Sequence, residues 1–311
     1  MQDIILFSTS QPMPDFTART ARLAADFGLT DAAPLSQPGA DNQAVDYFAT
    51  TKARPNLDRP DLDRPDLDRP NLAQLRAAAG QMGLDANILP AEGREKKLLL
   101  ADMDSTIITS ESLDDLANMA GLGAAVSQIT ARAMAGELDF LAALEERLAL
   151  LRGQPASLLE QLKQETVLTG GAAVLAATMR ARGGSCYLVS GGFTFMTGHI
   201  ADRAGFDGHF GNIMLVEEGR LAGRVQPPVL DRDAKLSILK RLVAETGLTM
   251  EQALSVGDGA NDLDMLAAAG LGVAFQGKPL LRENISCQLN HTDLTGLLFL
   301  QGIPDSAFVP G

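Results

Sequence analysis

The sequence is poor in the residues that mark several classes of protein. Its 311 residues include only two cysteines and three histidines, and no tryptophan. Two cysteines cannot build the disulfide framework of a small secreted protein, so a reducing compartment is expected. The histidines, His199, His209 and His291, are scattered and lack the spacing of metal ligands. The glycines form no P-loop pattern, which argues against a nucleoside triphosphate site.

Long apolar runs and excess positive charge are also missing. No stretch approaches the roughly 20 apolar residues that a membrane-spanning helix needs. The first residues lack the basic segment of a signal peptide, so we expect a cytoplasmic protein. The formal net charge of −13 argues against a general nucleic-acid surface. We therefore expect neither a membrane nor a nucleic acid as partner.

The most informative stretch is Asp102-Met103-Asp104, which directly follows the apolar run at 98–101. Such a run predicts a buried strand, and open α/β sheets bind ligands at the carboxyl ends of their strands. Two carboxylates this close repel each other and need a cation or a proton between them. The pair predicts a metal site or an acid–base site, although a bare Asp-x-Asp is more often a polar turn.

Three later segments favour the functional interpretation. Ser190-Gly191-Gly192 and Asp258 each follow a predicted strand, Lys235 lies near the start of a predicted helix, and Asp262 follows Asp258 closely. Together with Asp102-Met103-Asp104 they resemble, in order, the four motifs of the haloacid dehalogenase superfamily of phosphohydrolases. The resemblance covers roughly residues 95–295. It implies a Rossmann-like α/β fold with an inserted helical cap, and the alternation of strands and helices itself predicts a mostly parallel sheet.

The chain is expected to have two domains. Residues 1–89 read as a small α+β domain of a regulatory type, residues 90–96 as a polar linker, and residues 97–311 as the phosphatase domain with its cap at about 107–170. A proline-rich repeat at 54–70 forbids a regular helix or a central strand there. The repeat is either a docking segment or a tolerated surface loop, and the loop is favoured.

The resemblance implies a role for each motif residue. Asp102 would attack phosphorus to form an aspartyl-phosphate, and Asp104 would act as general acid and base. Mg²⁺ would be held by Asp102, the backbone carbonyl of Asp104 and Asp258, with Asp262 as a further ligand or the partner of a bound water. The phosphate-binding residues would be Ser190, Gly191, Gly192 and Lys235.

The expected cap also resembles the phosphoserine phosphatase family, around Glu111 and Arg147. There an acid binds the ammonium group of the substrate and an arginine its carboxylate, which suits the planar guanidinium. Taken alone, both residues would be ordinary charges on a helix surface. The expected activity is hydrolysis of O-phosphoserine, a small molecule, in the last step of serine biosynthesis. Further substrate-binding candidates are Met134, Phe140 and Asn261.

Two alternatives stay open. One is another small-metabolite phosphatase or phosphotransferase on the same scaffold, and the other is a non-catalytic phosphoserine-binding regulator. The complete set of acids and the lysine argue against the regulator. Asp104 argues against a haloalkanoate dehalogenase, because halide leaves without a proton and such enzymes lack this acid. The sequence leaves the oligomeric state open, with a homodimer as one candidate.

Overall fold

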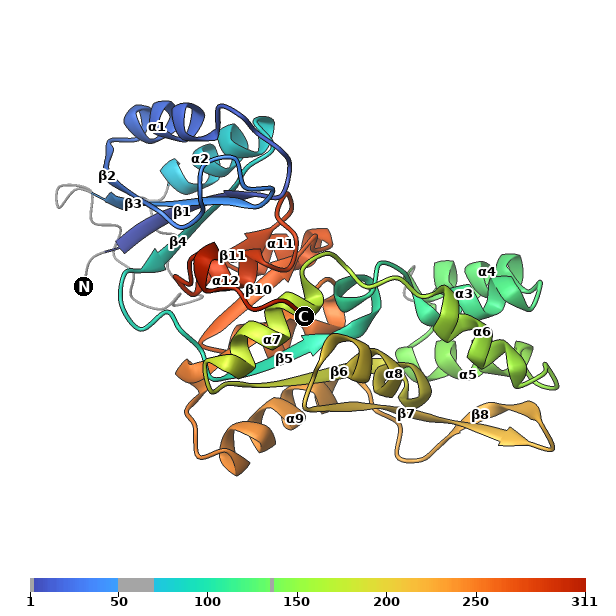
Figure 1. Ribbon diagram of the computed structural model, residues 1–311. Coiled ribbons are helices and arrows are strands. Elements are labelled where there is room, and N and C mark those ends of the chain that lie inside the picture. The colour runs from blue at the N-terminus through green and yellow to red at the C-terminus, as the bar shows by residue number, and fades with distance from the viewer. Residues whose placement is uncertain (1–2, 50–69, 135–136) are drawn as a thin grey trace.

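The computed structural model describes residues 3–49, 70–134 and 137–311. Figure 1 shows an N-terminal α/β part, a central sheet with helices on both faces, and a group of helices at the far end of that sheet. The repeat at 54–70 lies outside the described residues except for Pro70, which begins a helix. Among the described helices, none has the length and apolar character that a membrane crossing requires.

The N-terminal part is a four-stranded antiparallel sheet in the order β2-β3-β1-β4 with two helices on one face. Its elements are β1 (Asp3–Thr9), α1 (Phe16–Asp26), β2 (Leu29–Pro34), β3 (Gln43–Ala49), α2 (Pro70–Gln81) and β4 (Asp85–Pro90). The sequence pattern did not predict β2. That strand lacks regular alternation, and its pairing shifts between Thr30 and Ala32, where Asp31 has a φ of 52°.

Alternate residues of β1 join the two parts of the molecule. Ile5 and Phe7 pack with the helices of the N-terminal part, whereas Ile4 and Leu6 belong to the main apolar cluster of the central sheet. This division follows from the two-residue period of a strand, which sends successive side chains to opposite faces. The N-terminal sheet is therefore buried on both faces.

The central sheet has seven strands in the order β11-β10-β9-β5-β6-β7-β8, and all neighbouring pairs are parallel except β7 with β8. Its strands are β5 (Leu98–Asp102), β6 (Ser185–Phe193), β7 (Gly208–Glu217), β8 (Arg220–Gln226), β9 (Ala253–Gly257), β10 (Leu271–Phe275) and β11 (Cys287–Leu289). Its helices are α7 (Ala172–Ala181), α8 (Thr194–Ala204), α9 (Arg232–Glu245), α10 (Leu263–Ala268), α11 (Pro279–Asn284) and α12 (Gly296–Leu300). The predicted fold class, a mostly parallel α/β sheet, is confirmed.

Four helices lie between β5 and α7 in the chain: α3 (Ser112–Met119), α4 (Gly123–Met134), α5 (Phe140–Leu150) and α6 (Ser157–Glu165). Figure 1 shows them together at the end of the sheet where β5 ends, so they occupy the place expected of the cap. The two connections to them run side by side, because Ile108 pairs with Leu168 in an antiparallel bridge. The Glu218-Gly219 turn signal within 211–225 predicts a hairpin, and β7 and β8 form it.

Polar contacts fix the N-terminal part to the end of the chain. Asp85 accepts hydrogen bonds from the backbone N–H groups of Asn290, His291 and Thr292 and from the Thr292 hydroxyl, at 2.7–3.0 Å. Arg94, within the expected linker, is buried and forms a 2.6 Å ion pair with Asp46. Arg94 also donates to the carbonyls of Phe299 and Leu300, so this one residue of the expected linker contacts both parts.

Candidate active site

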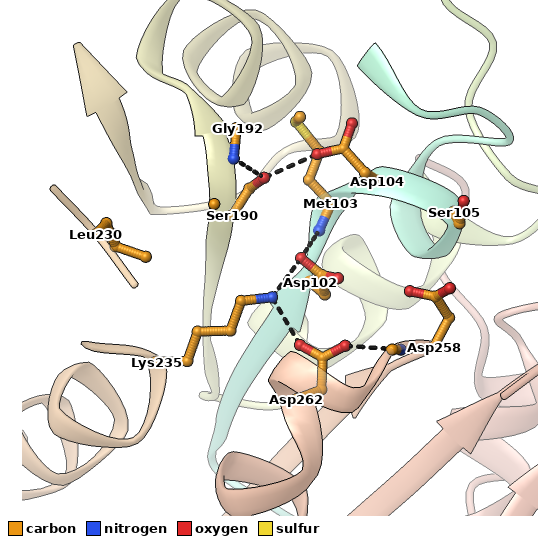
Figure 2. Close-up of polar contacts among 12 residues, drawn as sticks. Asp102, Met103, Asp104, Ser105, Ser190, Gly192, Leu230, Lys235, Asp258 and Asp262 are labelled. Atoms are coloured by element: carbon orange, nitrogen blue, oxygen red, sulfur yellow. Dashed lines mark hydrogen bonds and ion pairs between the residues drawn. The ribbon is translucent and has the colours of Figure 1, made fainter. Parts of the chain in front are cut away.

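The acids meet because neighbouring parallel strands end at one edge of the sheet. Asp102 is the last residue of β5, Ser190 lies in β6 beside it, and Asp258 directly follows β9 on the other side. Figure 2 shows these side chains converging with Lys235 of α9 and Asp262. The position is the ligand-binding edge expected for an open α/β sheet.

Lys235 forms ion pairs with two of the acids, Asp102 and Asp262. Its Nζ lies 2.8 Å from Asp102 Oδ1 and 2.6 Å from Asp262 Oδ1. The residue is only 1% exposed, so it is not a solvated lysine on the surface of the helix. Asp231 caps α9 by accepting the N–H of Ala234, which fixes the turn that carries the lysine. Burial lowers the pKa of Lys235, but the two carboxylates outweigh it and hold the pKa above the usual range.

The surroundings of Asp102 are more negative than positive. Burial raises the pKa of its carboxyl, the charge of Asp262 raises it further, and Lys235 only partly offsets them. The backbone N–H of Met103 donates to the same Oδ1 at 2.8 Å, which fixes the orientation of the carboxylate. The site therefore favours an additional positive charge next to Asp102.

The three acids form a cluster that suits a divalent cation. Asp102, Asp258 and Asp262 each offer a carboxylate oxygen, and these oxygens lie within 4.8 Å of one another. Hard oxygen donors are the ligands that Mg²⁺ prefers, so the donor set fits the expected cofactor. The contribution of the Asp104 backbone carbonyl stays a prediction.

Asp104 is held by donors on two sides. The chain turns sharply here, in η1 (Met103–Ile107), where Asp104 is extended and Ser105 has a φ of 54°. The backbone N–H of Ser112 donates to Asp104 Oδ1 and the Ser190 hydroxyl donates to Oδ2, both at 2.8 Å. The N–H of Gly192 in turn donates to Ser190 Oγ. A side chain at 192 would begin 2.9 Å from that oxygen, so the close approach requires glycine.

A cavity of about 260 Å³ opens between this edge and the helical cap. Of the predicted site residues, its lining includes Asp102, Asp104, Glu111, Phe140, Arg147, Ser190, Gly191, Gly192, Asp258 and Asn261. Lys235 and Asp262 are not part of the lining and lie behind Asp102. Met134 ends α4, and its side chain lies outside the described residues.

The cap contributes one acidic and one basic residue, Glu111 and Arg147, to the cavity. Glu111 accepts a 2.8 Å hydrogen bond from the Ser105 hydroxyl, and burial together with the charge of Asp104 raises the pKa of its carboxyl. Arg147 donates to the carbonyl of Ala143 at 3.2 Å. Burial lowers the pKa of its guanidinium, and nearby acids partly restore it. Opposite charges on the cap thus face the acids of the sheet.

Sequence reasoning assigned no role to three polar residues of the site: Ser105, Ser112 and Lys278. Lys278 lines the cavity and its Nζ lies 3.0 Å from Asp258 Oδ2. A usable signal existed, because the apolar run at 271–275 predicts a strand and Lys278 follows it, at the same edge of the sheet. Ser112 acts through its backbone N–H, which carries no sequence signal.

Comparison with known proteins agrees with this geometry. The haloacid dehalogenase-like hydrolase family matches residues 99–267. A phosphoserine phosphatase of Archaeoglobus fulgidus is 39% identical over 233 residues, covering 74% of this chain and 68% of the relative. One of Lactococcus lactis subsp. lactis is 41% identical over 211 residues, covering 68% of this chain and 98% of the relative. A longer relative from Streptomyces coelicolor is covered over 56% of its length.

Solved structures show the same arrangement. A hydrolase of the haloacid dehalogenase family from Salmonella enterica serovar Typhi has a TM-score of 0.82 and 28% identity, covering 96% of this chain and 98% of its own. A phospho-aspartyl intermediate analogue of phosphoserine phosphatase has a TM-score of 0.62 and 36% identity, covering 66% of this chain and 98% of its own. The resemblance found in the motifs is confirmed, and the chain belongs to the haloacid dehalogenase-like hydrolase family.

Proposed function

We propose that the protein is a phosphoserine phosphatase, a phosphoric monoester hydrolase that converts O-phosphoserine to serine and phosphate, with Mg²⁺ as its cofactor. The observation that carries the proposal is the pairing of charges across one cavity. Glu111 and Arg147 on the cap match the ammonium and carboxylate of an amino acid, while Asp102 and Asp104 at the sheet edge face the phosphoester. Relatives named phosphoserine phosphatase support the same substrate.

Asp102 is proposed to attack the phosphorus atom, so that the bond from phosphorus to the serine oxygen breaks as an aspartyl-phosphate forms. Lys235 and the Met103 amide fix the carboxylate for this attack. Asp104 gives its proton to the departing serine oxygen and then takes one from the water that cleaves the aspartyl-phosphate. Its two hydrogen-bond donors, Ser112 and Ser190, keep it beside the reacting group.

The metal fits the acids that the sheet brings together. Asp102, Asp258 and the backbone carbonyl of Asp104 would hold Mg²⁺, with Asp262 as a further ligand or the partner of a bound water. Its charge would offset the repulsion between an anionic nucleophile and an anionic phosphate. Lys235 neutralises part of the same cluster from the protein side. Ser190 and the amides of Gly191 and Gly192 are proposed to bind the phosphate oxygens.

The domain organisation and the location are proposed with the function. We propose an N-terminal domain ending at 89 with a regulatory role, and a catalytic part from 97 with a cap at about 107–170. The separate sheets and the side-by-side connections at Ile108 and Leu168 support this division. A cytoplasmic location agrees with two buried cysteines that form no disulfide with each other.

The substrate assignment is tested by comparing two substrates on two variants. Arg147→Ala removes the carboxylate partner and leaves the sheet-edge residues unchanged. We expect kcat/KM for phosphoserine to fall by a factor that corresponds to about 2–5 kcal/mol of lost transition-state stabilisation, as for loss of a buried bidentate contact. An aryl phosphate, which has no carboxylate, should change far less.

Glu111→Gln should show the same selectivity through the ammonium group. Both variants are measured with and without Mg²⁺, on a panel that includes other small phosphorylated metabolites. Equal losses on phosphoserine and the aryl phosphate would show that the two cap residues support folding or chemistry, and the substrate assignment would be wrong. Preferred turnover of another metabolite would favour a different phosphatase on this scaffold.

A further inference from the structure

Lys278 stands between the sheet edge and the cap. It lies after β10, at the start of α11, and its backbone N–H donates to the carbonyl of Asp258 at 2.9 Å. Its Nζ lies 3.0 Å from Asp258 Oδ2 and 4.0 Å from Glu111 Oε1. One ammonium group therefore approaches both a proposed metal ligand and the proposed acceptor of the substrate ammonium.

Lys278 places a positive charge at the cavity. Its backbone is tied to the loop after β9, while its side chain is 58% exposed and lines the cavity. Its Nζ has a carboxylate oxygen on each side, from Asp258 and from Glu111, and an unperturbed lysine is charged at neutral pH. Lys235, by contrast, does not line the cavity, and its Nζ is held by Asp102 and Asp262.

We propose that Lys278 is a specificity-determining residue, the internal counter-ion of Glu111 and Asp258, which the substrate ammonium and the divalent cation displace when they bind. The claim that the substrate ammonium displaces Lys278 rests on the proposed function. The claim that a divalent cation displaces it, the metal half of the proposal, depends only on the acids of the sheet edge.

Elementary electrostatics fixes the direction of each effect. Without the Lys278 charge, Glu111 attracts an ammonium group more strongly, and Asp258 attracts a divalent cation more strongly. The phosphate dianion loses a nearby positive charge, whether or not the substrate carries an amine. A comparison of two substrates that differ only in the amine cancels this last effect and isolates the contact with Glu111.

The substrate experiment uses Lys278→Met, which keeps the length of the side chain and removes its charge. The measured quantity is the ratio of kcat/KM for O-phosphoserine to that for its analogue with a hydroxyl in place of the amine. Because both partners are about half exposed, we expect this ratio to rise about two- to fivefold. Lys278→Arg should keep the ratio of the wild type, and Glu111→Gln should lower it.

The metal experiment uses Mg²⁺ alone, without substrate. The midpoint of thermal unfolding is followed as Mg²⁺ is added, since a ligand that binds the folded state raises it. Lys278→Met should reach half of its stabilisation at about two- to fivefold lower Mg²⁺ than the wild type. Lys240→Met is the matched control, because Lys240 is an exposed lysine on α9. Lys240→Met should change neither the ratio of kcat/KM values nor the Mg²⁺ concentration at half of the stabilisation.

The outcomes separate the two hypotheses. An unchanged ratio together with an unchanged Mg²⁺ midpoint would overturn the proposal and leave Lys278 a solvated surface residue. A shift in the Mg²⁺ midpoint alone would overturn the specificity role and leave a counter-ion of Asp258. If the wild type does not prefer phosphoserine to its hydroxyl analogue, the proposed function fails, and the Mg²⁺ titration still decides the metal half.

Discussion

Asp85 and Asp102 are two buried aspartates with opposite surroundings. They are 3% and 4% exposed, and burial raises the pKa of both carboxyls. After burial, the largest influences on the pKa of Asp85 are hydrogen-bond donors in the segment 290–292, which lower it. At Asp102 the next influence is the charge of Asp262, which raises it further.

The difference separates a structural acid from a functional one. The charge of Asp85 is met by four donors, as a buried polar group requires, and it joins segments about two hundred residues apart. Asp102 is crowded by the like charge of Asp262, which Lys235 offsets in part. Unbalanced buried charge costs stability, and it is typical of active sites, where substrate or metal completes the balance. The same substitution, aspartate to asparagine, should therefore act oppositely at the two positions.

The largest expected effect is on turnover. Asp102→Asn keeps the shape of the side chain but removes the attacking anion, so kcat should fall by several orders of magnitude while the fold is retained. Acid quenching with phosphate-labelled substrate should trap label on the wild type and none on the variant. Asp85→Asn should keep a kcat near that of the wild type per folded molecule. Substantial turnover by Asp102→Asn would rule out the covalent route.

The next effect is on stability. Asp85→Asn turns one carboxylate oxygen into an NH₂ group that faces N–H donors of the 290–292 segment. We expect the free energy of unfolding to fall by about 2–4 kcal/mol, because buried donors lose their acceptor. Urea denaturation followed by circular dichroism measures it, with Asp202→Asn as the control on the exposed face of α8. A loss equal to that of the control would show that the junction is not held through Asp85.

Sequence reasoning singled out the proposed nucleophile of this pair, Asp102, and assigned no role to Asp85. Asp102 follows an apolar run and shares a motif with Asp104, and both signals are local. The partners of Asp85 lie 205–207 residues further along the chain, and such contacts leave no periodicity in the sequence. For the same reason the central strands other than β11 were predicted, whereas the burial of Arg94 in the expected linker was not. Lys278 was missed although its place after a strand could have indicated it.

The smallest expected effect is the pH dependence of stability in the metal-free protein. The folded protein binds a proton at Asp102 more tightly than the unfolded chain, because the pKa is raised from its ordinary value of 3.8. Stability contributed by this carboxyl is therefore lost as pH rises from that value through the raised pKa. Asparagine carries no such proton, and Lys235 keeps Asp262 as a partner in the variant. Metal-free Asp102→Asn should thus be more stable than the wild type at pH 8, and the gap should shrink toward pH 4.

Thermal unfolding of both proteins across this pH range, with a chelator present, measures the gap. Saturating Mg²⁺ should reverse the order, since it stabilises the wild type at the carboxylate that the variant lacks. Asp85→Asn, treated identically, should be less stable than the wild type at pH 8 both with the chelator and with Mg²⁺. A gap at Asp102 that stayed constant with pH would show that Lys235 fully balances the cluster, and the contrast between the two aspartates would then rest on geometry alone.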